Sequence, residues 1–433
     1  MNENTDSIIS WDKQHTWHPF TQMQAWCAPD HEPLVLVEGQ GAILTDSRGR
    51  SYLDGNSSIW TNIHGHGHPR IVNAIRQQLD AVAHVSFLGS TNVPAAQLAH
   101  QLAALFPEQK LPRTFYSDDG STAIEVALKM ALQFWQLQGE PQRYRIVAFQ
   151  GAYHGDTAGA SSLGGIPLFH ERFQRFHFPV ERVASLEELV ALPAFHQNEV
   201  AAIVIEPLIQ GAAGMRLWPQ GMLAELRNLC DSNGALLILD EILTGFGRTG
   251  TLFACEQEHI VPDLLALAKG LTGGYLPLAV TLTTARIFEA FLGKFEEQKT
   301  LYYGHSYTGN PVACAAALAS LEIFREENVL EKLQTKISFL RELLNDLKSM
   351  PHIADIRQCG FIAGIDVRQP SGIPYPWQAQ TGARICVAAR AYGLLTRPIK
   401  DTIVLMPPLC TTEEQLLTAV NAVRQAVLQI CGN

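Results

Sequence analysis

Four short runs of apolar residues, each of strand length, lie in the middle of the chain. They are Arg145–Phe149, Val200–Ile205, Ala235–Leu239 and Leu264–Ala268. Each run is apolar at almost every position rather than at alternate ones, which indicates strands buried on both faces. The stretches between them have helical spacing, most clearly over Ser121–Gln138. This order predicts an α/β fold in which helices cover both faces of a mainly parallel sheet.

The two ends of the chain have different patterns. Residues 1–60 are turn-rich and read as extended, and the segment 1–64 is expected to contribute to a small domain. After Asn310-Pro311, which predicts a helix start, the chain becomes more charged from about residue 326. The elements expected there are helices over Val329–Leu347 and from Glu413, and strands at Ile353–Arg357, Phe361–Val367 and Thr402–Met406. We therefore predict a large domain over 65–325 and a smaller α+β domain over 326–433.

Composition narrows the classes of partner. The 433 residues carry a net charge of −10, and no run is rich in Lys or Arg, so neither nucleic acid nor an anionic membrane is an expected partner. Small-molecule substrates fit better. Only 17% of residues are charged, which indicates a large core or a subunit interface. The first residues lack the charged and apolar regions of a signal peptide, so a cytoplasmic location is expected.

Neither the cysteines nor the histidines indicate a metal site. The 8 cysteines include no C-x-x-C pair, unlike a zinc ribbon or a disulfide scaffold. His64, His66 and His68 alternate with glycines, but no Cys or carboxylate lies at ligand spacing. We read them as turn histidines beside the entrance to the active site and assign no metal. P-loop, nucleophile-elbow and zincin motifs are also absent from the sequence.

The most informative stretch runs from Leu236 to Gly274. Asp240 ends one apolar strand, and Lys269 ends another before the glycine-rich turn Gly270–Gly274. Burial at such a position lowers the pKa of an amine and makes its neutral, nucleophilic form accessible. A lysine whose ammonium reaches back to solvent is the ordinary alternative, and one lysine alone would not exclude it.

Two further features complete a set. Gly120 and Ser121 open the expected helix, where free backbone N–H groups can hold a phosphate. Tyr153 places an aromatic ring directly after the first apolar strand. A Schiff-base lysine, an acid to pair with a pyridinium, a phosphate cradle and a stacking ring are together what pyridoxal 5′-phosphate (PLP) requires.

The Leu236–Gly274 block resembles the signature of class III aminotransferases, and the resemblance covers nearly the whole chain. Other segments resemble the branch of this family that converts 8-amino-7-oxononanoate to 7,8-diaminononanoate in biotin biosynthesis. They include Trp17–Met23, Asp54–Trp60, Gly151–Asp156, Glu206–Gly211, Gly245–Gly250, Phe253–Glu256 and Arg397-Pro398. The resemblance implies a fold-type I PLP-dependent transferase, with a large mainly parallel-sheet domain and a smaller α+β domain. It also implies a homodimer with shared active sites.

The resemblance assigns roles to residues of the cofactor site. Lys269 would form the Schiff base with PLP and move the proton between substrate and cofactor, while Asp240 would keep the pyridine nitrogen protonated. Gly120 and Ser121 would bind the phosphate, and Tyr153 would stack on the ring and contact substrate. His305 and Ser306 of the partner subunit would complete the phosphate site.

Other residues would bind substrate. Trp60 would line the substrate channel, and Arg397 would bind the carboxylate of 8-amino-7-oxononanoate through its guanidinium. Phe20 and Gly304 stand at positions that differ between branches of the family. Members that use S-adenosylmethionine have tyrosine at Phe20, paired tryptophans at Ile59-Trp60 and Gly-Pro-Thr at 304–306. Because Gly304-His305-Ser306 is similar to the lysine-using branch, the amino donor is open between S-adenosylmethionine and lysine.

Two alternatives stay open. The first is another class III enzyme, an ω-amino-acid or diamine aminotransferase, because the cofactor residues are shared across the family. The second is a non-catalytic PLP-binding protein on the same fold, against which the joint presence of Lys269 and Asp240 argues.

Overall fold

A seven-stranded sheet of order β4-β12-β11-β10-β7-β5-β6 forms the centre of the computed structural model, which describes residues 4–432. Its strands are β4 (Arg113–Ser117), β5 (Arg145–Phe149), β6 (Val180–Val183), β7 (Val200–Ile205), β10 (Leu236–Asp240), β11 (Leu264–Leu267) and β12 (Ala279–Thr283). Strand β12 runs antiparallel to both of its neighbours, β11 and β4, and the other neighbouring pairs are parallel. The prediction of a mainly parallel sheet is confirmed, and all four apolar runs form strands of it.

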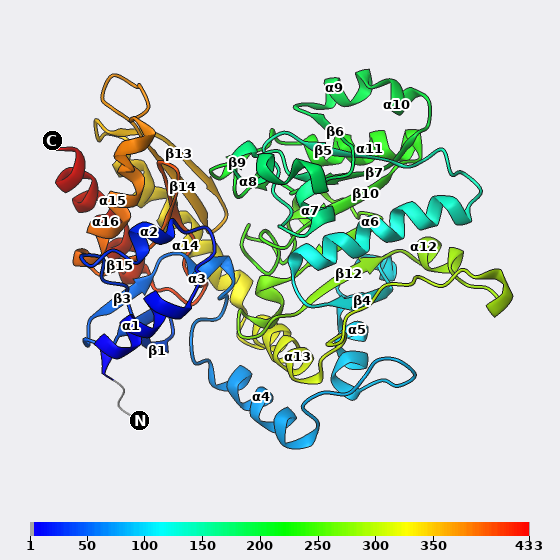
Figure 1. Cartoon of the computed structure of the whole chain (residues 1–433), viewed down its shortest axis with the longest axis horizontal. Coiled ribbons are helices and arrows are strands. Elements are labelled where there is room, and N and C mark those ends of the chain that lie inside the picture. Colours follow the sequence, from blue (N-terminus) through cyan, green and yellow to red (C-terminus); the bar gives the residue numbers. More distant parts are fainter. Residues whose placement is uncertain (1–3, 433) are drawn as a thin grey trace.

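Both faces of this sheet are covered by helices, as the apolar runs predict (Figure 1). Leu236 and Ile238 of β10 pack into one core with α6 (Gly120–Leu137), whereas Leu237 and Leu239 point into a second core on the other face. The helices of this part are α4 (Pro69–Ala81), α5 (Val93–Ala104), α7 (Ala158–Leu163), α8 (Pro167–His170), α9 (Leu186–Ala191), α10 (Pro193–His196), α11 (Met222–Asn233), α12 (Ala285–Ala290) and α13 (Pro311–Glu326).

The C-terminal part is built on an antiparallel sheet of order β13-β14-β17-β16. Its strands are β13 (Ile353–Cys359), β14 (Ile362–Val367), β16 (Pro398–Ile399) and β17 (Thr402–Leu405), and its helices are α14 (Val329–Leu347), α15 (Thr381–Ala389) and α16 (Glu413–Cys431). Each strand and helix expected after residue 326 is present, so this α+β pattern is confirmed.

The N-terminal segment joins the C-terminal part through a second sheet. Strands β1 (Leu36–Gln40), β2 (Ile43–Asp46) and β3 (Ser51–Asp54) form a meander, and β3 pairs in parallel with β15 (Leu394–Leu395). Figure 1 shows the blue N-terminal and the orange-to-red C-terminal segments side by side, apart from the cyan-to-green sheet. The domain boundaries after residues 64 and 325 stay a prediction.

The expectation that residues 1–60 are extended is wrong for three segments. They are the helices α1 (Thr5–His15), α2 (Met23–Trp26) and α3 (Ser57–Trp60). No residue of α1 is buried, and only Ile8, Ile9 and Trp11 among its residues are large and apolar, so its apolar pattern is too short to indicate a helix clearly. Its signals are at its ends, where the Asn4 side chain accepts a hydrogen bond from the amide of Asp6.

Across residues 4–432, none of the helices combines the length and the apolar character that crossing a lipid bilayer requires.

A glycine turn connects the C-terminal part to a loop of the large sheet. Gly360 lies between β13 and β14 with a φ of +56°, and a Cβ at this position would overlap the backbone of Thr249. The next residue, Phe361, donates its backbone N–H to the carbonyl oxygen of Arg248 at 2.8 Å. Only glycine satisfies both the left-handed conformation and the close approach here.

We expect Gly360→Ala to destabilise the protein by more than Gly372→Ala. Gly372 also has a positive φ, of +80°, but it has open space around its missing Cβ. The control therefore carries only the conformational cost, about 1–2 kcal/mol. Gly360→Ala adds steric displacement of the Thr249 backbone, about 1–3 kcal/mol more. Urea unfolding measures both, and equal losses would show that the contact contributes nothing.

Candidate active site

Chemically active side chains follow four neighbouring strands of the large sheet. Lys269 follows β11, Asp240 ends β10, Glu206 follows β7, and Tyr153 and His154 come soon after β5. These strands run parallel, so their carboxyl ends meet at one edge of the sheet. All five residues line one cavity of about 700 Å³.

The same cavity contains most of the residues predicted from the sequence. Its lining includes Phe20, Trp60, Gly120, Ser121, Tyr153, Asp240, Lys269 and Arg397. These residues come from the N-terminal segment, the large sheet and the C-terminal part. The three parts therefore close around one space, and the exposed surface of that space is mainly apolar.

Lys269 is held in an unusual backbone conformation at the start of a 3-10 turn, with a φ of +43°. Its Nζ atom lies 5.2 Å from the centre of the Trp60 ring. Burial lowers the pKa of this amine below that of an ordinary lysine, while the charges of Asp240 and Glu206 act in the opposite direction. The balance makes the neutral amine accessible closer to neutral pH, as expected from the sequence.

Asp240 has a partner that sequence reasoning missed. Its Oδ2 atom lies 2.7 Å from Nδ1 of His154, and its Oδ1 atom accepts the backbone N–H of Ile242. Burial lowers the pKa of His154, but the hydrogen bond to Asp240 and the negative charges of Asp240 and Glu206 together outweigh burial and raise it. The contact with His154 also fixes the position of the Asp240 carboxyl group from the protein side. The adjacency of Tyr153 and His154 in the sequence was the available signal.

The phosphate-cradle candidates lie at the beginning of α6. Asp119 caps this helix by accepting the Thr122 N–H at 2.9 Å, and the preceding N–H groups of Gly120 and Ser121 belong to the first turn. Such N–H groups have no acceptor within the helix and suit an anion. Tyr153 lines the same cavity, and its hydroxyl donates to Asp156 at 2.6 Å.

The entrance to the cavity is formed by the N-terminal segment and the C-terminal part. Phe20 is 65% exposed and contacts Phe169 edge to face. Trp60 donates its indole N–H to Oδ1 of Asn56 at 2.8 Å, which fixes the plane of the ring. Arg397 lies at the rim and forms no ion pair within the described part of the chain.

Three predicted residues lie outside the cavity of this chain. Gly304, His305 and Ser306 are not among its lining residues. His305 is nevertheless close, because its Nδ1 atom lies 2.7 Å from Oδ2 of Asp118, which does line the cavity. Their expected contribution to a partner's site stays a prediction.

The three glycine-flanked histidines have separate partners. His64 is buried against Ser320, with Nε2 to Oγ at 3.1 Å, and His66 lies 2.9 Å from Asp54. The ring of His68 faces Glu327 at 3.5 Å. Within residues 4–432 no group of three or more potential ligands gathers in a metal-binding arrangement.

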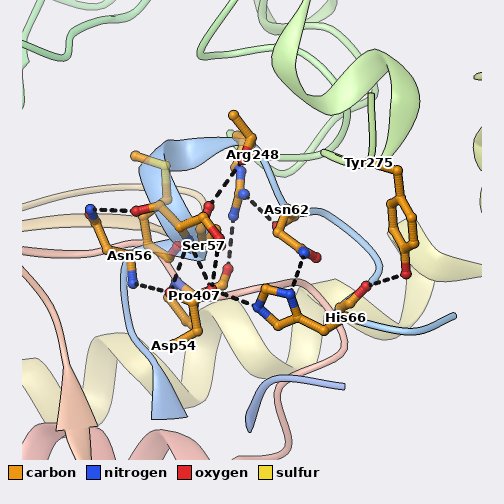
Figure 2. A network of polar contacts seen from close by, with 12 residues as sticks. Asp54, Asn56, Ser57, Asn62, His66, Arg248, Tyr275 and Pro407 are labelled. Carbon is orange, nitrogen blue, oxygen red and sulfur yellow. Dashed lines mark hydrogen bonds and ion pairs between the residues drawn. The ribbon is translucent and has the colours of Figure 1, made fainter. Parts of the chain in front are cut away.

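A buried network of polar contacts surrounds Arg248 and Asp54 (Figure 2). Arg248 is 1% exposed and donates to the carbonyl oxygens of Asn62 and Pro407, each at 2.8 Å. Asp54 accepts from His66 and from the backbone N–H of Ser58. The network thus joins the loop after β10, the N-terminal segment and the C-terminal part.

Tyr275 extends this network toward the lysine loop, as Figure 2 also shows. Its hydroxyl donates to the carbonyl oxygen of Gly65 at 2.8 Å and accepts the N–H of His68 at 2.6 Å. The missing Cβ of Gly274 allows its backbone to pack directly on that of Asn62. The segment that carries Trp60 and the loop that carries Lys269 are consequently held together.

Comparisons with known proteins agree with this geometry. The family profile described as aminotransferase class-III matches residues 26–427. The adenosylmethionine-8-amino-7-oxononanoate aminotransferase of Geobacter sulfurreducens is 44% identical, over 99% of both chains. A crystal structure of the enzyme of the same name from Methanocaldococcus jannaschii is 41% identical, with a TM-score of 0.96 over 99% of this chain and 100% of that one. An (S)-enantioselective omega-transaminase from Thermomicrobium roseum is 30% identical, with a TM-score of 0.91 over 99% of both chains.

The fold and the site therefore define a transaminase of fold type I, the class of PLP-dependent transferases with a large α/β domain. Within that class, the chain belongs to the class III aminotransferase family.

We expect Arg248→Met to lower the free energy of unfolding substantially. The substitution leaves the carbonyl oxygens of Asn62 and Pro407 buried without their donor, at a cost of about 1–3 kcal/mol for each. Arg325→Met is the control, because that guanidinium is on the surface and 67% exposed. Chemical denaturation compares the two variants, and equal midpoints would show that the network does not stabilise the fold.

Proposed function

We propose that this aminotransferase binds PLP in the cavity and transfers an amino group to 8-amino-7-oxononanoate, giving 7,8-diaminononanoate for biotin synthesis. The observation that carries the proposal is the identity of 44% to a relative named for this reaction, over 99% of both chains. Other relatives of the same name are 46% and 42% identical. An apolar cavity with Arg397 at its rim suits a long keto acid whose carboxylate is at one end.

The residues present fit PLP. Gly120 and Ser121 would hold its phosphate at the α6 N-terminus, where both residues line the cavity and their backbone N–H groups have no acceptor within the helix. Tyr153 would cover one face of the pyridine ring, and Asp240 would face its nitrogen. His154 contacts Asp240 through Nδ1, and its other ring nitrogen, Nε2, is buried without a hydrogen-bond partner in the described structure.

When bound, PLP supplies an aldehyde that condenses with amines and a ring that accepts the electron pair released at the substrate carbon. The protein's own contribution is proton management. Lys269, with its lowered pKa, can accept a proton from the substrate near neutral pH and pass it to the cofactor. Asp240, held in place by its hydrogen bond with His154, would face the ring nitrogen and keep it protonated. The apolar walls limit access of water to the reacting carbon.

We propose S-adenosylmethionine as the amino donor, because the relatives that match over nearly the whole chain are named for it. Phe20, Ile59 and Trp60 all line the cavity, so the wall next to a bulky donor is apolar and partly aromatic. Phe20 lacks the hydroxyl that a tyrosine would present there. Lysine is the alternative donor, because Gly304-His305-Ser306 resembles the lysine-using branch.

The test is a pair of half-reactions followed in the absorbance of the PLP-loaded enzyme. S-adenosylmethionine is expected to change the cofactor spectrum, and 8-amino-7-oxononanoate is then expected to restore it and yield 7,8-diaminononanoate. If only lysine changes the cofactor spectrum, lysine is the amino donor. Response to an ω-amino acid or a diamine, with no turnover of 8-amino-7-oxononanoate, would overturn the proposal in favour of a broader ω-aminotransferase.

In the same assay, Lys269→Ala is expected to lose turnover by on the order of 10²–10⁴-fold, because the proton carrier is gone. Lys336→Ala is the matched control. Lys336 is also a partly buried lysine with a lowered pKa, but its amine donates to the carbonyl oxygen of Leu409, away from the cavity. Equal activity of the two variants would refute the assigned role of Lys269.

We further propose a homodimer in which His305 and Ser306 of the partner subunit complete the phosphate site. Exposed large apolar side chains support an interface, since Leu88, Val93, Phe295 and Tyr302 are each at least 69% exposed. The 304–306 loop reaches Asp118, at the cavity rim of its own chain, so it lies on the same face as the entrance.

Mixing two inactive variants tests this arrangement. Lys269→Ala and His305→Ala/Ser306→Ala proteins, allowed to exchange subunits, are expected to recover up to about a quarter of wild-type activity. In the mixed dimer, one site combines an intact Lys269 with the intact loop of its partner. If the loop serves its own chain, no mixed dimer contains a complete site and activity stays absent.

A further inference from the structure

Glu206 is a second buried carboxyl group in the cavity wall. It follows β7, which lies between β10 and β5, so its side chain belongs to the same sheet edge as Asp240 and Tyr153. The residue is 6% exposed and lines the cavity. The sequence signal was the same as for Asp240, an acidic residue directly after an entirely apolar strand.

The two oxygens of Glu206 are fixed by different loops. Oε1 accepts the backbone N–H of Tyr153 at 3.1 Å, and Oε2 accepts that of Gly211 at 2.9 Å. Gly211 in turn lies beside Trp60 and Leu243, where a Cβ would crowd the Leu243 side chain. Glu206 therefore ties the loop that carries the Tyr153 ring to the loop next to Trp60.

The charge of Glu206 is not neutralised by a direct ion pair. Within residues 4–432 no cationic side chain lies within ion-pair distance of its oxygens, whereas Asp240 engages His154. Burial raises the pKa of Glu206 to about 7, with His154 opposing the rise and Asp240 adding to it. Its negative charge raises the pKa of Lys269, as does that of Asp240, while Arg248 lowers it. The Tyr153 hydroxyl donates to Asp156, so Glu206 contacts Tyr153 through its backbone N–H.

We infer that Glu206 is a positioning residue of this site, whose carboxylate holds the Tyr153 loop and stabilises the protonated nitrogen of Lys269, so that it sets the pH at which that nitrogen releases its proton. The inference rests on the proposed binding of PLP, because the proton is read out at the lysine–cofactor pair. Asp240 and Glu206 then divide their roles: Asp240 is paired with His154, and Glu206 acts on Lys269 through space.

The experiment is a pH titration of the cofactor absorbance in the PLP-loaded Glu206→Gln enzyme. Removal of a negative charge destabilises the protonated nitrogen, so the titration midpoint is expected to fall by about 0.5–1 pH unit relative to wild type. The shift concerns the range above the pKa of Glu206, about 7, where the wild-type carboxyl is ionised. The affinity for PLP, measured by equilibrium dialysis, is a second readout of the displaced Tyr153 loop and is expected to weaken.

Glu241→Gln is the matched control. Glu241 is also fully buried, also accepts two backbone N–H groups, those of Ala254 and Cys255, and also has a pKa raised to about 7 by burial. It does not line the cavity and is not among the charges that act on Lys269. Its substitution is expected to lower stability while the titration midpoint stays at the wild-type value.

An unchanged midpoint in Glu206→Gln, or an equal shift in Glu241→Gln, would overturn the inference. If Glu206→Gln does not fold, Glu206→Asp withdraws the carboxylate by one methylene, and its midpoint is expected to fall by a smaller amount. An unchanged Asp midpoint then overturns the inference. Because the titration needs no substrate, failure to form 7,8-diaminononanoate rejects the proposed reaction without affecting this result, and failure to bind PLP rejects both.

Discussion

The site depends on one constraint, the parallel alignment of four neighbouring strands. Because β11, β10, β7 and β5 all end at the same edge, whatever follows each strand is brought to one place. The amine, the two carboxyl groups and the aromatic ring are far apart in the chain, yet each lies just beyond a strand that is apolar on both faces. The buried strands cannot shift without exposing two cores, so the edge is rigid and the groups on it are held in register.

Burial at this edge has opposite effects on acids and bases. It favours the neutral form of Lys269 and of Glu206, and both are drawn toward neutral pH from opposite directions. Asp240 differs from both in being hydrogen-bonded to the side chain of His154. A lysine with a lowered pKa, a glutamic acid with a raised pKa and a hydrogen-bonded aspartate therefore line one mainly apolar cavity, and each has a different set of partners.

Much of this could be predicted from the sequence, and the reasons are specific. Doubly apolar strands such as Val200–Ile205 leave a strong signal, and an acid or lysine at the end of such a strand stands out, as Asp240 and Lys269 did. Glu206 also follows an apolar strand, but it was considered only as the first residue of the Glu206–Gly211 motif. Helix α1 was not predicted because only Ile8, Ile9 and Trp11 among its residues are large and apolar, too few for the repeating pattern that indicates the other helices. Gly304, His305 and Ser306 do not line the cavity of their own chain, and their role rests on the family resemblance alone.

Segments from outside the large sheet form the other walls of the cavity. Ser57, Ser58 and Trp60 all have positive φ values, a conformation that costs free energy in residues other than glycine. The buried contacts of Asp54 and Arg248 hold this turn in place, and Asn56 orients the indole it presents. The same guanidinium contacts Pro407, so the C-terminal part is joined to the turn through buried atoms. Buried contacts therefore connect the C-terminal part to the turn of Trp60, and Tyr275 and Gly274 connect the N-terminal segment to the loop that follows Lys269.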